Sequence, residues 1–128
     1  MSIYMWRTYI PPELCFTANT AGSTVQLTKN WSPTSVTLEK SSDWLTWTSY
    51  TIGDTITLSN IGDSVYFRNT STADTWFSTA TYAYYQFVMS GSISASWDIT
   101  YLLNKNNITP LTNFCFCKLF WNCTALRS

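Results

Sequence analysis

The chain has 128 residues, which is enough to bury one hydrophobic core and too few for two complete domains. Hydrophobic residues make up 45% of it and charged residues 11%, so the composition excludes a disordered chain and leaves the surface to uncharged polar groups. The seven basic and seven acidic residues cancel and lie singly along the sequence, so we expect no nucleic-acid binding.

Hydroxyl residues supply most of that polar surface. Thr and Ser occupy 37 of the 128 positions, and Thr is β-branched, which suits the exposed face of a strand. The N-terminal sequence MSIYMWRTYIPPELCFTA is interrupted by Pro11 and Pro12 and has no export-signal pattern, and no apolar run approaches the roughly 20 residues of a membrane helix. We therefore expect an all-β domain with no membrane span.

The first predicted strands follow a lead-in of residues 1–12, which ends at the two prolines. Short runs lie at 14–17, 24–28 and 35–39, and in the second and third of them apolar residues alternate with polar ones. This period of two indicates a strand with one buried face. The residues predicted to point into the core are Val25, Leu27, Val36 and Leu38.

A tryptophan-rich run follows at 44–50. We predict it to be a strand with Trp44 and Trp47 on opposite faces, so that one of the two rings lies in the core. Two Ile-Gly-Asp turns, nine residues apart, then begin strands within 52–58 and 61–67.

Two further alternating runs, at 82–89 and 92–100, complete the strand-forming part of the sequence. Each has one apolar face, made of Tyr85, Phe87 and Met89 in the first and of Ile93, Ala95, Trp97 and Ile99 in the second. The total of about seven to eight short strands with turns between them predicts an Ig-like antiparallel β-sandwich over residues 13–104.

The remaining residues, 105–128, differ in character. They begin with a polar stretch that Pro110 ends, and their apolar residues then recur at mixed helical spacings. This pattern predicts a short helix across residues 113–121.

Three stretches of the sandwich region, FTANTAGSTV (16–25), SPTSVTL (32–38) and IGDTITL (52–58), resemble the leading β-domain of BspA-like leucine-rich-repeat surface proteins. The tail CFCKLFWNCTAL (115–126) is similar to the opening of that family's repeat. The resemblance implies a bacterial protein at the cell surface or outside the cell, with an adhesive role, or a phage virion protein that carries the same module. Because one repeat unit cannot bury its own apolar face, residues 105–128 should be a stub that folds back on the sandwich or docks on a partner.

Catalysis is poorly supported by the residue types present. The chain has no His, which excludes catalytic triads and Cys–His pairs. Its seven carboxylates are Glu13, Glu39, Asp43, Asp54, Asp63, Asp74 and Asp98, and those at 54 and 63 follow Gly in the matched turns, where we expect turn formers. The sequence therefore predicts a protein that is not an enzyme and uses no cofactor.

The four cysteines are Cys15, Cys115, Cys117 and Cys123. Buried free thiols, one or more disulfides, and a four-thiolate metal site are all open, in that order of preference. The spacing of the two cysteines at 115 and 117 is not that of a zinc knuckle, so we assign no metal site.

The aromatic residues are the best candidates for binding, because seven Trp and eight Tyr exceed the needs of one small core. Their rings stack on sugars or anchor a protein partner. The candidate ligand-binding residues are Trp31, Trp76, Tyr82 and Tyr84, and the candidate partner-binding residues of the tail are Phe114, Phe116, Phe120 and Trp121.

These observations predict a non-enzymatic, surface-exposed binding or adhesion module for a glycan or protein partner. The alternative is a structural phage virion protein, a fibre or decoration component, that assembles through its aromatic tail. Exposed apolar tail residues would also favour a homo-oligomer.

Overall fold

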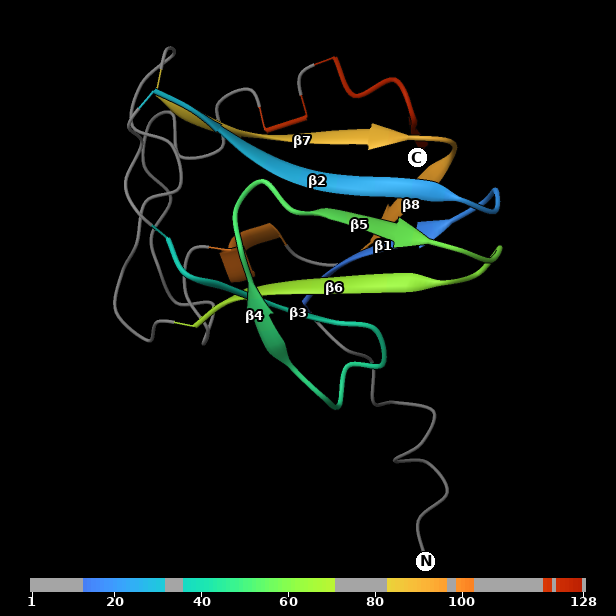
Figure 1. The fold of residues 1–128 in the computed structure, drawn as a ribbon, viewed down its shortest axis with the longest axis horizontal. Helices are drawn as coiled ribbons and strands as arrows, with labels where there is room; N and C mark the ends of the chain where they lie inside the picture. Colours follow the sequence, from blue (N-terminus) through green and yellow to red (C-terminus); the bar gives the residue numbers. More distant parts are fainter. Residues whose placement is uncertain are drawn as a thin grey trace, which may run out of the picture.

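The computed structural model describes residues 13–31, 36–70, 83–96, 99–102, 119–120 and 122–127. In this part of the chain, nine β-strands form two sheets (Figure 1). The strands are β1 (Leu14–Ala18), β2 (Ser23–Asn30), β3 (Leu38–Ser41), β4 (Thr48–Tyr50), β5 (Thr55–Leu58), β6 (Ser64–Asn69), β7 (Tyr84–Ser90), β8 (Ile93–Ser96) and β9 (Leu126–Arg127).

A large sheet and a small sheet pack face to face. The large sheet has six strands in the order β4-β3-β6-β1-β8-β9, and the small sheet has three in the order β5-β2-β7. All neighbouring strands are antiparallel except β8 and β9, which pair in parallel. The predicted all-β sandwich is confirmed.

The core between the sheets is built from the alternating residues. Val25, Leu27 and Leu38 are fully buried, as predicted, and Val36 packs against them at the margin of the core. Phe16, Phe67 and Phe87 are also fully buried, and their ring centroids lie 4.9–6.0 Å apart. Each buried Phe side chain stabilises the fold by about 1.5–3 kcal/mol, so these rings are a main contribution to the sandwich. Of the apolar face predicted for the last run, Ile93 is buried but Ala95 is exposed, and Trp97 lies outside the described residues.

The prediction of a strand across 44–50 is wrong for its first half. Only Thr48–Tyr50 is a strand, and Trp44 has a φ of 65°, which an extended strand does not allow. Side chains of the preceding residues bond to the backbone N–H groups here, in place of a neighbouring strand. Neither Trp44 nor Trp47 is buried, so the prediction that one of them is a core residue is also wrong.

The described part of the tail packs on the sandwich. The backbone N–H of Phe87 in β7 donates to the carbonyl of Leu119 at 2.8 Å, and the N–H of Ile93 donates to Ala125 at 2.9 Å. Leu119 is buried, and Phe120 packs against the core. Leu119 and Phe120 form a turn and not a helix, and the rest of the helix predicted across 113–121 lies outside the described residues. The described residues after it, 122–127, include β9.

The two sheets differ in width, and this difference shapes the surface. Strand β5 is an edge of the small sheet, and in Figure 1 β6, β3 and β4 continue below it. Part of the inner face of β3 and β4 therefore has no strand of the small sheet over it. A 3₁₀ turn (Ile99–Leu102) is the helix that the described residues contain, and no helix among them is long and apolar enough to cross a membrane.

Candidate ligand groove beside β5

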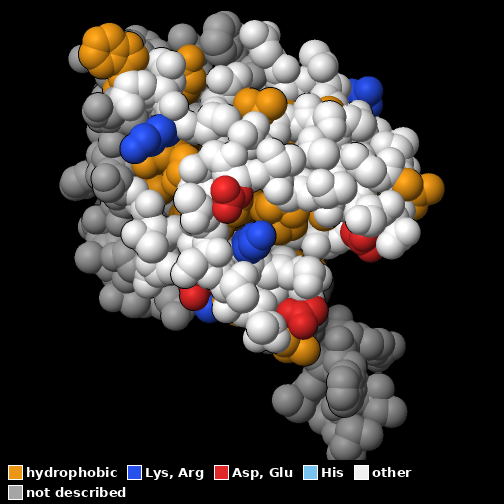
Figure 2. Space-filling view, viewed as in Figure 1, with side chains coloured by type: hydrophobic (Ala, Val, Ile, Leu, Met, Phe, Trp, Pro, Cys, Tyr) orange, Lys and Arg blue, Asp and Glu red, His pale blue; other side chains and the backbone are white. Residues whose placement is uncertain are grey.

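A groove lies where the large sheet extends past β5. Its volume is about 290 Å³, at the small end of the range for ligand sites. Figure 2 shows a basic side chain at this surface, with hydrophobic side chains beside it, below the edge of β5. The residues that line the groove are Lys40, Ser41, Ser42, Thr46, Thr48, Ile56 and Val65.

Strand register places three of the groove residues, Lys40, Thr48 and Ile56, on the inner face of the sandwich. Lys40 pairs with the core residue Phe67 on one side and with Thr48 on the other, and paired residues share a face. On the small sheet, Ile56 pairs with the buried Val25 and points the same way. The floor of the groove is therefore the margin of the core, and its rim is polar.

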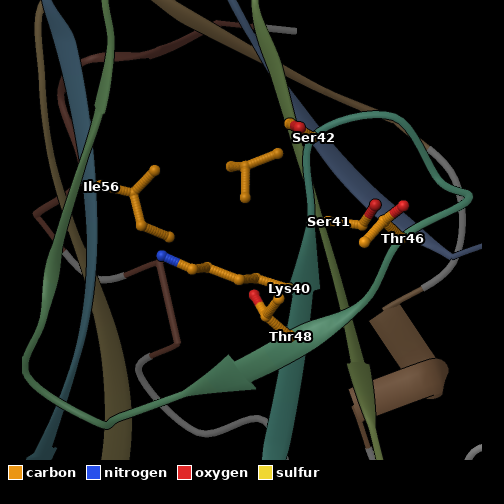
Figure 3. Close-up of a pocket in the computed structure, with 7 residues that line it drawn as sticks. Lys40, Ser41, Ser42, Thr46, Thr48 and Ile56 are labelled. Atoms are coloured by element: carbon orange, nitrogen blue, oxygen red, sulfur yellow. The ribbon is translucent and has the colours of Figure 1, made fainter.

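Lys40 is a charged residue at a position that alternation assigns to the core side. In Figure 3 its side chain extends from β3 across the groove toward Ile56, with Thr48 next to it. Lys40 is half-buried, and within the described part of the chain its ammonium forms no ion pair. An inward-pointing lysine also discourages edge-to-edge pairing of sheets, which gives this residue a structural role besides binding.

The neighbouring ion pair lies on the other face of the large sheet. Arg68 Nε donates to Glu39 Oε1 at 2.8 Å, and both residues are one position away from the inner-face pair Lys40 and Phe67. The Arg68 guanidinium also lies over the ring of Trp47, 3.9 Å from its centroid, which is a cation–π contact. On the outer face, the charges of Arg68 and Glu39 are therefore paired with each other.

The carboxylate of Asp43 bonds to the backbone of the loop that forms one wall of the groove. Asp43 Oδ1 accepts hydrogen bonds from the backbone N–H groups of Leu45 and Thr46, both at 2.9 Å, and from Ser41 Oγ at 3.0 Å. The hydrogen bonds from Thr46 and Leu45, and then that from Ser41, hold the pKa of Asp43 below its ordinary value. Ser41 Oγ in turn accepts from Trp44 N at 2.8 Å, so the hydroxyl wall has a defined position without a ligand.

The lining side chains provide one ammonium group, four hydroxyls and two aliphatic groups. Such a set binds an anionic or polyhydroxylated ligand by ion pairing and hydrogen bonds, and its floor accepts an apolar surface. The described lining residues include no carboxylate that could pair with Lys40 as an acid and base for proton transfer.

The structure separates the predicted ligand-binding aromatics. Trp31 follows β2 with a φ of 60° and is 74% exposed, so its ring is accessible. Tyr84 lies next to it in the ladder, opposite Asn30, but only 7% of it is exposed, so the prediction that its ring faces a ligand is not supported. Trp76 and Tyr82 lie outside the described residues.

The tail aromatic that can be placed packs against the core. Phe120 stacks on Phe87 with a centroid distance of 5.6 Å and an interplanar angle of 15°. Part of its ring is therefore used in a contact within its own chain, and the rest is exposed. Phe114, Phe116 and Trp121 lie outside the described residues.

The cysteines and the turn carboxylates have ordinary structural surroundings. Cys15 is buried, Cys123 is half-buried, and both are free thiols; burial raises the pKa of the Cys123 thiol. Cys115 and Cys117 lie outside the described residues, among which no three His, Cys, Asp or Glu side chains gather to hold a metal ion. Asp54 and Asp63 lie in turns, as predicted, with Asp63 Oδ2 accepting from Asn60 N at 3.1 Å.

Two more of the seven carboxylates can be placed, and both bind neighbours. Glu13 is buried and accepts a hydrogen bond from the indole N–H of Trp44, and Glu39 pairs with Arg68. Asp74 and Asp98 lie outside the described residues. No pair of described carboxylates lines the groove.

Lys40 and Thr48 were not among the site residues predicted from the sequence. The signal for Lys40 was present, because it lies two positions after the inward-pointing Leu38 and continues the alternation of that strand. A lysine at an inward position is unusual enough to mark a site. Thr48 carried no comparable signal in a chain so rich in hydroxyls.

Comparisons with known proteins add nothing to this assignment. The chain matches no protein-family model, no curated protein and no solved structure. The function of the groove has to be inferred from its own geometry and chemistry.

Proposed function

We propose that this chain is a non-enzymatic, surface-exposed binding module of a BspA-like surface protein, and that it holds a glycan or protein partner in the groove beside β5. One observation carries the proposal: Lys40 occupies an inward, half-buried position where it forms no ion pair with a described carboxylate. An ammonium that no described carboxylate neutralises can pair with an anion or a hydrogen-bond acceptor of a ligand.

The construction of the groove supports the same proposal. Its described residues lie on four strands, β3, β4, β5 and β6, and on a loop fixed by Asp43, so the binding groups are held in place before a ligand arrives. A preorganised site loses less conformational entropy when it binds. The hydroxyls and the ammonium recognise a polar ligand without acting on it chemically.

The alternative function, a phage virion component assembled through the tail, depends on Phe114, Phe116 and Trp121, which lie outside the described residues. Phe120 is committed to Phe87 in its own chain, so it gives the alternative less support than the groove gives the binding module. The two functions make different demands, because a virion component must assemble and a binding module need not.

The experiment that tests the proposal compares the full chain with a groove-blocking variant on glycan and surface-protein arrays. Thr48→Trp places a large side chain in the groove, whereas Thr57→Trp is the matched control, since Thr57 is equally an exposed threonine of a strand but does not line the groove. We expect the wild type and Thr57→Trp to bind the same partner and Thr48→Trp to lose it. The proposal fails if no partner binds, or if Thr48→Trp binds as well as the wild type.

Light scattering on the same samples distinguishes the binding module from the virion component. A monomer that binds through the groove supports the binding module. A stable oligomer whose mass is the same in Thr48→Trp, without array binding, supports the virion component.

A further inference from the structure

We infer that the groove is selective for a sugar that carries a carboxylate, with the Lys40 ammonium as the ion-pair partner of that carboxylate. This inference rests on the proposed binding function and adds the chemical class of the ligand. The charge, the hydroxyls and the shape of the groove support this inference.

The charge of the groove is matched by a ligand with one negatively charged group. Among the described residues that line the groove, Lys40 is the one cationic side chain, and none is a carboxylate. A single ammonium matches the single charge of a carboxylate, whereas phosphate groups and nucleic acids are usually held by several cations or by the fork of an arginine.

The hydroxyls of the groove match those of a sugar. Ser42, Thr46 and Thr48 can each donate and accept a hydrogen bond, which is the pattern that sugar hydroxyls require. In Figure 3 Thr48 lies beside the Lys40 stem and Thr46 lies on the loop side of the groove, so these hydroxyls line one side of the groove while the ammonium extends toward Ile56.

The floor and the size of the groove agree with one sugar ring. Ile56 and Val65 offer an aliphatic surface to the C–H groups of a ring. The volume of about 290 Å³ suits a small ligand rather than an extended chain. The competing occupant is an acidic side chain of a partner protein, which supplies the carboxylate but not the surrounding hydroxyls.

The test is an NMR titration of the full, ¹⁵N-labelled chain with four probes: D-glucuronate, D-glucose, acetate, and a short peptide with one Glu. We expect glucuronate to shift the amide signals of Lys40, Thr48 and Ile56 and to bind at least about 10-fold more tightly than glucose or acetate, as loss of a charge-assisted contact implies. Glucose binding as well as glucuronate overturns the inference. So does a peptide that binds at these residues when glucuronate does not, and that result identifies a protein partner.

Variants of Lys40 provide the second arm of the test. Lys40→Gln should weaken glucuronate binding about 10-fold or more, Lys40→Arg should retain most of it, and Lys29→Gln is the control because Lys29 is an exposed lysine of β2 outside the groove. Unchanged binding in Lys40→Gln overturns the inference. If that variant does not fold, the comparison of probes on the wild type still decides.

Failure of the inference can be told from failure of the proposed function. If a neutral partner binds on the arrays and Thr48→Trp no longer binds it, the proposed binding function holds and the inference of a sugar acid is rejected. If the chain binds neither a partner on the arrays nor any of the four probes, both the proposed function and the inference are rejected.

Discussion

The hydroxyl of Tyr50, on β4 of the large sheet, accepts a hydrogen bond at 2.9 Å from the backbone N–H of Leu27, on β2 of the small sheet. It also donates to the carbonyl of Asp54 at 2.6 Å, just before β5. One phenol therefore joins the two sheets and the start of the strand that borders the groove. Since Thr48 and Tyr50 share a face of β4, this link also fixes the position of the groove wall.

Replacing Tyr50 by Phe tests this link. Tyr50→Phe leaves the Leu27 N–H without its acceptor inside the core, so we expect the free energy of unfolding to fall by about 1–3 kcal/mol. Urea denaturation followed by fluorescence measures it. Asp54→Ala is the control, because it keeps the main-chain carbonyl that Tyr50 uses and should change stability much less. Equal stability of Tyr50→Phe and the wild type would contradict a structural role for the hydroxyl.

The same residue predicts a response to alkaline pH. Burial raises the pKa of Tyr50 above its ordinary value, so the folded chain retains this proton at a pH where the unfolded chain has lost it. The corresponding stability is fully present below the ordinary tyrosine pKa of about 10 and is lost as pH rises above it. We expect stability to fall above about pH 10, and more steeply in the wild type than in Tyr50→Phe. The slope does not vanish in the variant, because burial raises the pKa values of Tyr66 and Tyr85 too. Parallel slopes for the two proteins would show that Tyr50 does not contribute.

Gly91, in the turn between β7 and β8, has no room for a side chain. Its φ is +83°, and a Cβ there would lie 2.9 Å from the Cβ and 3.0 Å from the Cα of the buried Ser23, and closer still to its hydroxyl. Gly62→Ala is the matched control: its φ is +91°, but a Cβ would meet nothing within 4 Å. We expect Gly62→Ala to cost about 1–2 kcal/mol of unfolding free energy from backbone strain alone, and Gly91→Ala clearly more. Similar midpoints of thermal unfolding for the two variants would refute the predicted contact.

Local alternation was sufficient to predict the sandwich, and its failures have identifiable causes. It located the cores of β2, β3 and β7 because one face of each is buried against the opposite sheet. It failed at Trp44, where side-chain oxygens of Ser41 and Asp43 occupy the backbone N–H groups that a strand would pair.

The candidate site was less accessible from the sequence, because it depends on contacts between distant residues. The position of Lys40 follows from alternation, but the groove itself exists because β5 is an edge strand while β3 and β4 extend past it. Strand order is a property of long-range pairing, such as that of β1 with β8, and no local pattern encodes it. The same holds for the contact of Leu119 with Phe87.

The stacking of Phe120 on Phe87 predicts that the tail stabilises the sandwich. Phe120 also meets the buried Phe16 edge to face, with centroids 6.2 Å apart. We expect Phe120→Ala to lower the free energy of unfolding by about 2 kcal/mol, less than for a fully buried Phe because part of the ring is exposed. Trp31→Ala, at a position that is 74% exposed, should change it by less than about 0.5 kcal/mol. If Phe120→Ala instead left stability unchanged and abolished an oligomer, the tail would be an assembly surface.

Asp43 predicts how the groove wall responds to acid. Its carboxylate accepts from the N–H groups of Leu45 and Thr46, and these bonds hold its pKa below the ordinary value. A group whose pKa is lowered by folding contributes stability above its unfolded pKa and loses it as pH falls through the folded value. The loop should therefore keep its structure below the pH at which an ordinary aspartate is protonated, and open only in stronger acid.

Amide chemical shifts of Leu45 and Thr46, followed by NMR as pH is lowered, test this response. In the wild type they should change together at a pH below the ordinary aspartate pKa of about 3.9. Asp43→Asn keeps an oxygen acceptor without the charge, so the amides should stay bonded and the pH-dependent step should disappear. Asp43→Ala removes the acceptor, so both amides should exchange faster at every pH, and ligand binding in the groove should weaken because Thr46 is no longer held in place. A wild-type transition at the ordinary pKa, or unchanged exchange in Asp43→Ala, would mean that the wall is held by contacts other than this carboxylate.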